Sequence, residues 1–396
     1  MKILYHHRTQ GRGAEGVHIV SIVKALQGLG HEVTVLSPAG VNPMEHAGNA
    51  PVDKSKVKTS GMSRFWKFVS NNIPGLLFEF LEIAYNLPAG RRLEKELKNN
   101  DYDLIYERYA FYLIAGALKA RKYGIPFVLE ANEVNGIKDR ARKQYLKSLA
   151  VFFEKRLFLL SSRIITVSSY LENLIYERLS GCEFDGDVVV APNAIDINKI
   201  PEKIKSDKLL SEYSISSEQK VIGFAGWFDH WDRLDIFVDL IAAMRRKGHD
   251  VVGLLVGDGV GVTEARELSQ KLEIENYIIF TGAVNRQQIY SYLGLLDIAV
   301  FPHSNEFGSP VVMFEFMSLK IPVVAPKLLP ILDVLTDRDN ALLFDVLDEE
   351  MLASCMDEMI VDTELSTKLA ENAYNLIIEK HTWTNNASLI VDVIKR

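Results

Sequence analysis

Short apolar runs alternate with longer amphipathic stretches along the whole chain. In the first half, apolar runs bounded by turn-forming residues occur at residues 2–5, 32–36, 103–106, 127–130, 163–167 and 188–191. The second half repeats the pattern at residues 220–226, 251–256, 277–280, 298–301 and 322–325. Stretches of helical periodicity lie between these runs, for example at residues 17–29, 111–122, 144–160, 234–247, 262–272 and 286–295. Strands that alternate with helices in this way form parallel sheets.

The alternation predicts an α/β protein with two doubly wound, Rossmann-like domains. The first is expected at residues 1–197 and the second at residues 220–380. Residues 198–219 are polar and without strong periodicity, so they are predicted to be a linker that contains one helical turn.

One segment of the second half has the composition of a βαβ unit with an anion site. A loop of Gly, Ser and Pro joins an apolar run to an amphipathic stretch, and a second apolar run follows. Ser309 can cap the predicted helix, and Pro310 suits its first turn. The free N–H groups of Val311 and Val312 would then face an anion at the carboxyl edge of a parallel sheet.

Glu315 follows Val311 by four residues, so it lies one turn further along the same helical face. A carboxylate at that place can reach the ribose of a nucleotide whose pyrophosphate sits on the helix N-terminus. The alternative interpretation is a capped core helix with one solvated glutamate.

Composition and charge exclude several classes of protein. The chain has 396 residues, of which 48% are hydrophobic, so it can bury two sizeable cores. Its net charge of −7 gives no overall attraction to nucleic acid, and no nucleic-acid partner is expected. Cys182 and Cys355 lack the spacing of a zinc site and suit a reducing compartment. The N-terminal residues are predicted to form a strand rather than a signal peptide, and no apolar run reaches the roughly 18 residues that span a bilayer. We therefore expect a cytoplasmic protein, soluble or peripheral on the cytoplasmic face of the membrane.

Several motifs resemble those of the family 4 glycosyltransferases, which have the GT-B fold. The sequence Gly308-Ser-Pro310 followed by Phe314-Glu-Phe-Met317 resembles their donor-binding helix, in which the glutamate binds the ribose of a nucleotide-sugar. Other segments of the chain resemble further motifs of the family, and they follow in the same order along nearly the whole chain. They are residues 30–35, 190–196, 254–259, 280–282 and the tail that contains Trp383.

The resemblance implies a GT-B fold, with two Rossmann-like domains that face a central cleft. The first domain would bind the acceptor and be joined by a C-terminal helix at about residues 381–396, and the second would bind the donor. It further implies retaining, metal-independent transfer of a sugar from a nucleotide-sugar to a glycan or a lipid-linked acceptor, in the synthesis of a cell-surface polysaccharide or glycoconjugate. A UDP-sugar is favoured over a GDP-sugar. The nucleotide-sugar is a substrate, and no cofactor or metal is expected.

The same resemblance assigns residues to the donor. Gly282 and Ala283 are expected beside the base and Glu315 at the ribose. The pyrophosphate is expected at Gly308, Ser309, Pro310, Val311 and Val312.

A glycine-rich stretch at residues 11–16 matches GxGxxG and precedes a helix, as in dinucleotide-binding folds. Five residues separate it from the first predicted strand, whereas that fingerprint turns directly off its strand. The second predicted strand also lacks an acid that could hold the ribose of NAD. Gly13 and Gly16 instead suit the family's loop at which backbone approaches donor phosphate or acceptor. The alternative is a turn in which the glycines only allow the backbone conformation and bind no ligand.

The chain departs from the family pattern where cations usually neutralise the pyrophosphate. Trp227 and Asp232 occupy the positions of the usual Arg and Lys. Arg233 is the nearby cation that is expected to stabilise the leaving diphosphate, with a salt-bridged surface arginine as the alternative.

The assignment of catalytic carboxylates rests on less regular spacing. The first of the family's two paired glutamates is assigned to Glu306, although Glu306 stands one residue further from Glu315 than the usual spacing. Glu133 follows a predicted strand of the first domain and is assigned to orient acceptor hydroxyls or to accept a proton. For Glu107, on the strand before, a buried pair with Arg108 is the favoured interpretation.

Two other functions are compatible with these residues. A catalytically silent protein that binds a nucleotide-sugar or a partner would not need the missing Arg and Lys. A GT-B epimerase, which eliminates and re-adds a nucleoside diphosphate, would need more acids and bases in the cleft than the sequence offers.

A basic, aromatic segment precedes the apolar residues 73–87. It contains Lys54, Lys56, Lys58, Phe65, Arg64, Trp66, Lys67 and Phe68. Cations and aromatic rings at this density predict contact with an anionic membrane. The alternative is an excursion of the first domain whose aromatic rings pack on its own core.

Overall fold

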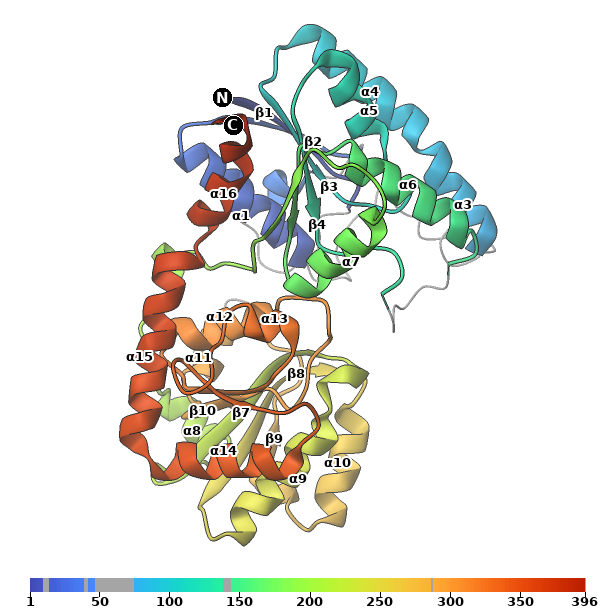
Figure 1. Cartoon of the computed structure of the whole chain (residues 1–396). Helices are drawn as coiled ribbons and strands as arrows, with labels where there is room; N and C mark the ends of the chain where they lie inside the picture. The colour runs from blue at the N-terminus through green and yellow to red at the C-terminus, as the bar shows by residue number, and fades with distance from the viewer. Residues whose placement is uncertain (10–13, 39–41, 47–74, 138–143, 286–287, 396) are drawn as a thin grey trace. The chain divides into compact units, whose positions relative to one another are not determined.

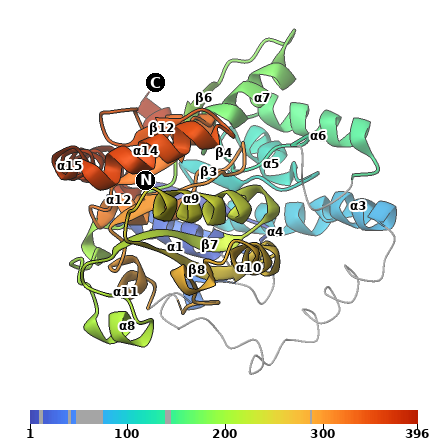
Figure 2. The same ribbon diagram turned by 90° about the horizontal axis from the view of Figure 1, so that it is seen from below.

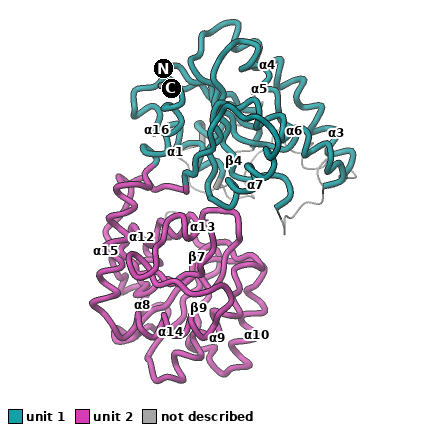
Figure 3. The backbone as a smooth tube through the Cα atoms, in the orientation of Figure 1, with its two compact units in different colours: residues 1–191, 383–396 teal, residues 192–382 magenta. Residues whose placement is uncertain are grey.

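The computed structural model describes residues 1–9, 14–38, 42–46, 75–137, 144–285 and 288–395 (Figure 1). The chain divides into two compact units, each built on one parallel six-stranded sheet with flanking helices. Unit 1 comprises Met1–Ala191 and Trp383–Arg396, and unit 2 comprises Pro192–Thr382 (Figure 3). The prediction of two Rossmann-like α/β domains is confirmed. Gly13 and the basic segment at residues 54–68 lie outside the described residues.

The sheet of unit 1 has the strand order β2-β1-β3-β4-β5-β6, and all of its neighbouring strands are parallel. The strands are β1 (Lys2–His6), β2 (Glu32–Leu36), β3 (Leu104–Arg108), β4 (Phe127–Ala131), β5 (Arg163–Thr166) and β6 (Asp187–Val190). The α-helices are α1 (Ala14–Gly28), α3 (Gly75–Ala84), α4 (Asn86–Asn99), α5 (Ala115–Tyr123), α6 (Lys147–Leu159), α7 (Ser169–Leu179) and α16 (Trp383–Val391). The described part of unit 1 also contains the short 3-10 helices η1 (Pro43–His46) and η5 (Asp392–Lys395). Strands β3, β4 and β5 are buried on both faces because helices cover them, so their apolar residues stand next to one another instead of alternating with polar ones.

The sheet of unit 2 has the order β12-β11-β10-β7-β8-β9 and is also parallel throughout. Its strands are β7 (Lys220–Phe228), β8 (Val251–Gly259), β9 (Ile278–Phe280), β10 (Ile298–Val300), β11 (Val323–Pro326) and β12 (Leu342–Phe344). The α-helices are α8 (Asp207–Glu212), α9 (Leu234–Arg246), α10 (Val262–Lys271), α11 (Ile289–Leu293), α12 (Val311–Ser318), α13 (Leu329–Leu332), α14 (Glu349–Val361) and α15 (Thr363–Lys380). The 3-10 helices are η2 (Ile197–Lys199), η3 (His230–Asp232) and η4 (Glu275–Tyr277).

The last helix of the chain, α16, packs against α1 in unit 1. The ring of Trp383 meets His18 of α1 edge to face, with ring centroids 4.8 Å apart. Ala387 and Ile390 of α16 lie in the same buried cluster as Ile19 and Val23 of α1. Burial of this apolar face explains why residues distant in sequence belong to one unit.

The boundary between the units falls six residues before the expected position, at residue 191 rather than 197. Residues 198–219, expected to be a linker, include η2 and α8. Leu209 and Ile215 of this stretch belong to the buried core of unit 2. Burial of these two apolar side chains holds the segment on its own unit.

One predicted helix begins later than its periodicity suggests. Helix α5 starts at Ala115 instead of near residue 111, because Tyr112 has a left-handed backbone with φ of 62°. No helix in the described part of the chain is long and apolar enough to cross a membrane.

Candidate functional site

The strand order of unit 2 reverses beside β7, which lies between β10 and β8. In open parallel sheets, ligands bind outside the carboxyl ends of the strands at such a reversal. Two loops meet there, the one after β7 and the one after β10. The imidazole Nδ1 of His303 lies 3.0 Å from the carbonyl oxygen of Trp231, and the rings of Trp231 and Phe307 meet edge to face. The loops are therefore fixed to each other at the edge where a ligand site is expected.

Glycines allow the ends of β7 and β8 to approach closely. Gly257 has φ of 141°, and a Cβ atom there would lie 1.8 Å from the carbonyl oxygen of Gly226. No side chain fits in that space, so glycine is required. The N–H of Gly257 donates to Thr281 Oγ1 at 3.2 Å, and Gly257 forms an isolated bridge with Gly282. These contacts bring Gly282 and the adjoining Ala283 to the carboxyl edge of the sheet.

Asn305 shapes the loop that leads from β10 to α12. Its Oδ1 atom accepts hydrogen bonds from the backbone N–H of Phe307 at 3.2 Å and of Gly308 at 2.5 Å. The N–H of Gly308 is thus used inside the loop. The N–H groups of Val311 and Val312 stand at the start of α12, where a helix leaves its first N–H groups without an intrahelical acceptor.

The prediction that Ser309 caps this helix is wrong. The N-cap is Pro310, with φ of −67° and ψ of 113°, and no side chain caps α12. Ser309 Oγ instead accepts a hydrogen bond from the N–H of Asn193 at 3.1 Å, and the Ser309 carbonyl accepts one from Asn193 Nδ2 at 2.7 Å. Asn193 lies in the segment 190–196, which resembles a family motif. Its two hydrogen bonds to Ser309 hold that segment against the loop before α12.

Glu315 lies within α12 and is buried, as are all residues from Met313 to Ser318. Val311, one turn earlier, is 39% exposed and marks the open end of the helix. Glu306 is exposed on the preceding loop. The structure thus places Gly282, Ala283, Glu306 and the sequence from Gly308 to Glu315 on loops and a helix at one edge of unit 2.

The residues in place of the family's two cations have different environments. Trp227 is 69% exposed at the end of β7. Asp232 is buried, and its Oδ2 atom accepts a hydrogen bond from the N–H of Asp229 at 2.7 Å, which closes the turn into α9. Burial raises the pKa of Asp232 to about 6. Asp232 therefore has a structural contact that a lysine could not make.

Arg233 has a left-handed backbone with φ of 49° and precedes α9. Its guanidinium donates two hydrogen bonds to Asp235, from Nε to Oδ1 at 2.8 Å and from Nη2 to Oδ2 at 2.6 Å. The alternative of a salt-bridged arginine thus describes the structure as it stands. To bind a phosphate through Nε and Nη2, Arg233 must release Asp235.

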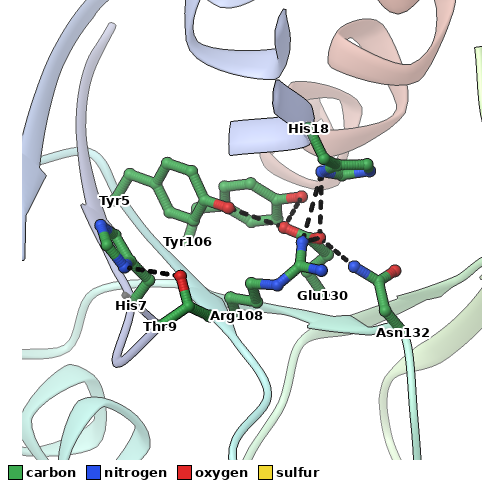
Figure 4. A network of polar contacts seen from close by, with 8 residues as sticks. All are labelled: Tyr5, His7, Thr9, His18, Tyr106, Arg108, Glu130 and Asn132. Atoms are coloured by element: carbon green, nitrogen blue, oxygen red, sulfur yellow. Dashed lines mark hydrogen bonds and ion pairs between the residues drawn. The ribbon is translucent and has the colours of Figure 1, made fainter. Parts of the chain in front are cut away.

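A second polar cluster lies in unit 1, around the carboxylate of Glu130 on β4 (Figure 4). Tyr5 and Tyr106 donate their hydroxyl hydrogens to Glu130 Oε2 at 2.8 Å and 2.9 Å. Arg108 and Asn132 donate to Oε1. Burial alone would raise the pKa of Glu130, but Arg108, with smaller contributions from the other partners, holds that pKa at about 2. This carboxylate is therefore ionised, and both of its oxygens accept hydrogen bonds from residues of its own unit.

The favoured pair of Glu107 with Arg108 is wrong, because Arg108 binds Glu130 and Glu107 binds His6. His6 Nδ1 and Glu107 Oε2 are 2.5 Å apart, and both side chains are buried. Neighbouring residues on a strand point to opposite faces of the sheet, so Glu107 and Arg108 do not pair with each other. Glu133 follows β4 in unit 1 and is half-buried, and Gly16 lies in the first turn of α1.

Among the described residues, no group of three or more His, Cys, Asp and Glu side chains is arranged to hold a metal ion.

Two family models match the chain. The model for Glycosyltransferase Family 4 matches residues 15–199, and the model for Glycosyl transferases group 1 matches residues 205–376. The chain belongs to the group 1 glycosyltransferases of family 4. The resemblance inferred from the motifs is confirmed, and the two matches cover most of both units.

Curated relatives are distant. An uncharacterized glycosyltransferase of Methanocaldococcus jannaschii is 22% identical over 240 residues, which are 59% of this chain and 60% of the relative. The N-acetyl-alpha-D-glucosaminyl L-malate synthase of Bacillus anthracis is 26% identical over 220 residues, 55% of this chain and 56% of the relative. The matched parts thus span less than two thirds of these relatives' own length.

Solved structures match over the whole chain. The Anabaena protein HepE in complex with UDP has a TM-score of 0.69 at 17% identity and is covered to 100%, as is this chain. A glycosyltransferase from Rickettsia africae has a TM-score of 0.73 at 16% identity, over 100% of this chain and 99% of that one. At such identities the likeness shows the fold.

Proposed function

We propose that the protein is a retaining, metal-independent glycosyltransferase that moves a sugar from a nucleotide-sugar to a glycan or lipid-linked acceptor. A UDP-sugar is the favoured donor, since the similar HepE structures are described as complexes with UDP and with UDP-glucose. A role in the synthesis of cell-surface polysaccharide or glycoconjugate, on the cytoplasmic side of the membrane, follows from such an acceptor.

The observation that supports the proposal is the carboxyl edge of unit 2. There the open N-terminus of α12, Glu315 one turn inside it and the glycines at the ends of β7, β8 and β9 stand at the reversal of the strand order. In the proposed complex, the N–H groups of Val311 and Val312 and the helix dipole stabilise the departing diphosphate. Glu315 holds the ribose, and Gly282 and Ala283 lie beside the base. Catalysis then consists mainly of electrostatic stabilisation of the leaving group.

Glu306 and Glu133 retain their proposed roles as acids near the reacting sugar and the acceptor. Glu306 is exposed on the loop before α12, so its carboxylate is accessible to a ligand at the helix N-terminus. Glu133 follows β4, the strand that carries Glu130, whose carboxylate is hydrogen-bonded within unit 1.

A silent, nucleotide-sugar-binding protein is the second candidate. It is favoured by the two lost cations and by the pairing of Arg233 with Asp235. Binding without turnover would need only the helix N-terminus and Glu315.

A donor panel separates these functions. Thermal unfolding with UDP-, GDP- and ADP-sugars identifies the donor, because a ligand at 100 times its dissociation constant stabilises a protein by roughly 2.7 kcal/mol. The best donor is then incubated with candidate glycan and lipid acceptors, and the products are analysed by mass spectrometry. A glycoside with the anomeric configuration of the donor supports the proposal. Binding without any product would favour the silent protein, and an epimerised donor would indicate an epimerase.

Arg233 is expected to compensate in part for the missing cations. Arg233→Ala should weaken nucleoside diphosphate binding by about 1 kcal/mol. The variant loses a charge-assisted contact with the phosphate, but this loss is partly offset because the wild type must break the Arg233–Asp235 ion pair before it binds. Binding of the bare nucleoside should not change. Isothermal titration calorimetry with both ligands measures the difference.

The matched variant is Asp235→Asn, which frees Arg233 without removing it and should tighten binding of the nucleoside diphosphate. Equal losses for nucleoside and nucleoside diphosphate in Arg233→Ala would assign Arg233 a purely structural role at the start of α9.

A further inference from the structure

Helix α3 of unit 1 has the reverse of the usual surface pattern. All of its exposed residues are apolar, and Leu76, Leu77 and Phe80 among them are 43%, 49% and 52% exposed. Both of its acids, Glu79 and Glu82, are buried. A helix on the surface of a soluble domain ordinarily turns its charges outward. Figures 1 and 2 both show α3 at the outer edge of unit 1.

Hydrogen bonds fix this orientation of α3. Glu79 accepts from the hydroxyl of Tyr112 at 2.8 Å and from the backbone N–H groups of residues 145 and 146, each at 2.8 Å. Glu82 accepts from Arg8 at 2.7 Å. A rotation that hid the leucines would break these contacts and leave the buried donors without acceptors. The apolar side chains therefore face outward as a consequence of the fold.

The neighbouring helix α6 repeats the inversion. Phe152 is 64% exposed, whereas Glu154 is buried and accepts from the hydroxyl of Tyr109 and the N–H of Asn135, both at 2.6 Å. The chain enters α6 from the two residues that donate to Glu79, so α6 begins beside α3. Leu87, at the start of α4, is 66% exposed.

Every fully exposed charged residue on these three helices is basic. They are Arg91, Lys95 and Lys98 on α4 and Lys147 and Arg156 on α6. The two chain segments that adjoin α3 and α6 outside the described residues, 47–74 and 138–143, also contain more Lys and Arg than Asp and Glu. An apolar surface with cationic surroundings complements an anionic interface.

We propose that this α3 surface, formed by Leu76, Leu77 and Phe80, docks on an anionic lipid bilayer. The apolar side chains would enter the boundary between headgroups and acyl chains, and the lysines and arginines would lie at the level of the lipid phosphates. Pairing of two copies through this surface would bring two basic surroundings together, which charge repulsion opposes. The proposal goes beyond sugar transfer and does not depend on the identity of the donor.

Cosedimentation with vesicles tests the proposal on the full chain. Phosphatidylcholine vesicles with about 30% phosphatidylglycerol serve as the anionic surface, and pure phosphatidylcholine vesicles serve as the neutral one. The test variant combines Leu76→Gln, Leu77→Gln and Phe80→Gln. A control variant combines Leu118→Gln and Tyr176→Gln, which are 47% and 49% exposed on α5 and α7 of the same unit.

We expect the wild type and the control to sediment with anionic vesicles more strongly than with neutral ones. Partitioning of the test variant should fall by about tenfold or more, since three inserted apolar side chains are lost. Its thermal unfolding should match that of the control, because the replaced side chains already face solvent.

Four results would overturn the proposal. The wild type could fail to bind anionic vesicles, or the test variant could bind like the wild type. The wild type could form a dimer that is absent in the test variant, and neither protein could bind vesicles. A second copy of the chain would then be the partner of the α3 surface. Binding that is lost on changing Arg64, Trp66 and Lys67 to alanine but kept in the test variant would assign the membrane contact to residues 54–68 and not to α3.

Discussion

Replacing Arg108 with alanine should lower the free energy of unfolding of unit 1 by about 3–5 kcal/mol, because it leaves the Glu130 carboxylate buried without a countercharge. The side chains of Arg108 and Glu130 are only 13% and 3% exposed, so water cannot take the place of the guanidinium. Hydrogen exchange of β3 and β4, followed by mass spectrometry, reports the stability of this unit separately. Exchange of the strands in unit 2 should not change.

The control for this change is Arg338→Ala in unit 2. Arg338 donates two hydrogen bonds to the carboxylate of Glu358, but it is 61% exposed. Its loss should cost less than about 1 kcal/mol. Adding Glu130→Gln to Arg108→Ala should restore part of the lost stability, since a neutral amide still accepts from Tyr5 and Tyr106.

Acid titration of unfolding gives an independent check on this pair. The pKa of Glu130 is lowered from 4.5 to about 2, so its contribution is complete above pH 4.5 and is lost as the pH falls towards 2. The Arg108→Ala variant should lose that part of the pH dependence. A loss of stability as small as that of Arg338→Ala would show that the Glu130 cluster is not a buried ionic core.

Replacing Glu315 with glutamine should weaken nucleotide binding by about 1–3 kcal/mol, because the amide keeps one acceptor oxygen but loses the charge that strengthens hydrogen bonds to the ribose. Calorimetric titration with the preferred nucleoside diphosphate and with its 2′-deoxy form isolates this contact. The wild type should bind the ribose form more tightly, and the variant should distinguish the two forms poorly.

Glu264→Gln on the exposed face of α10 is a matched control that should bind both nucleotides like the wild type. Because Glu315 is buried, thermal unfolding of the variant must first show an intact unit 2. If a folded Glu315→Gln variant kept the full preference for the ribose form, Glu315 would not contact the ribose. The main argument for placing the nucleotide on α12 would then fail.

Local sequence determined the secondary structure of the sheets and hence the fold class. The runs at residues 221–226, 251–256 and 298–301 are apolar throughout because both faces of their sheet are covered, and they lie in β7, β8 and β10. The loop of Gly, Ser and Pro before α12 was also visible in sequence, since proline is incompatible with the interior of a helix. Together with the order of the family motifs, these signals were enough to identify the family.

Only the tertiary structure decided which polar groups meet. Periodicity places Arg108 and Glu130 on neighbouring strands but does not give the register that pairs them, and it cannot show that Glu107 binds His6 instead. Ser309 looked like a helix cap because a cap is a local contact, whereas Asn193, which binds it, is more than a hundred residues away in sequence. The outward orientation of the leucines of α3 is likewise decided by contacts with residues distant in sequence. An amphipathic pattern shows that a helix has two different faces, but the hydrogen bonds of Glu79 and Glu82 decided that here the acidic face is buried.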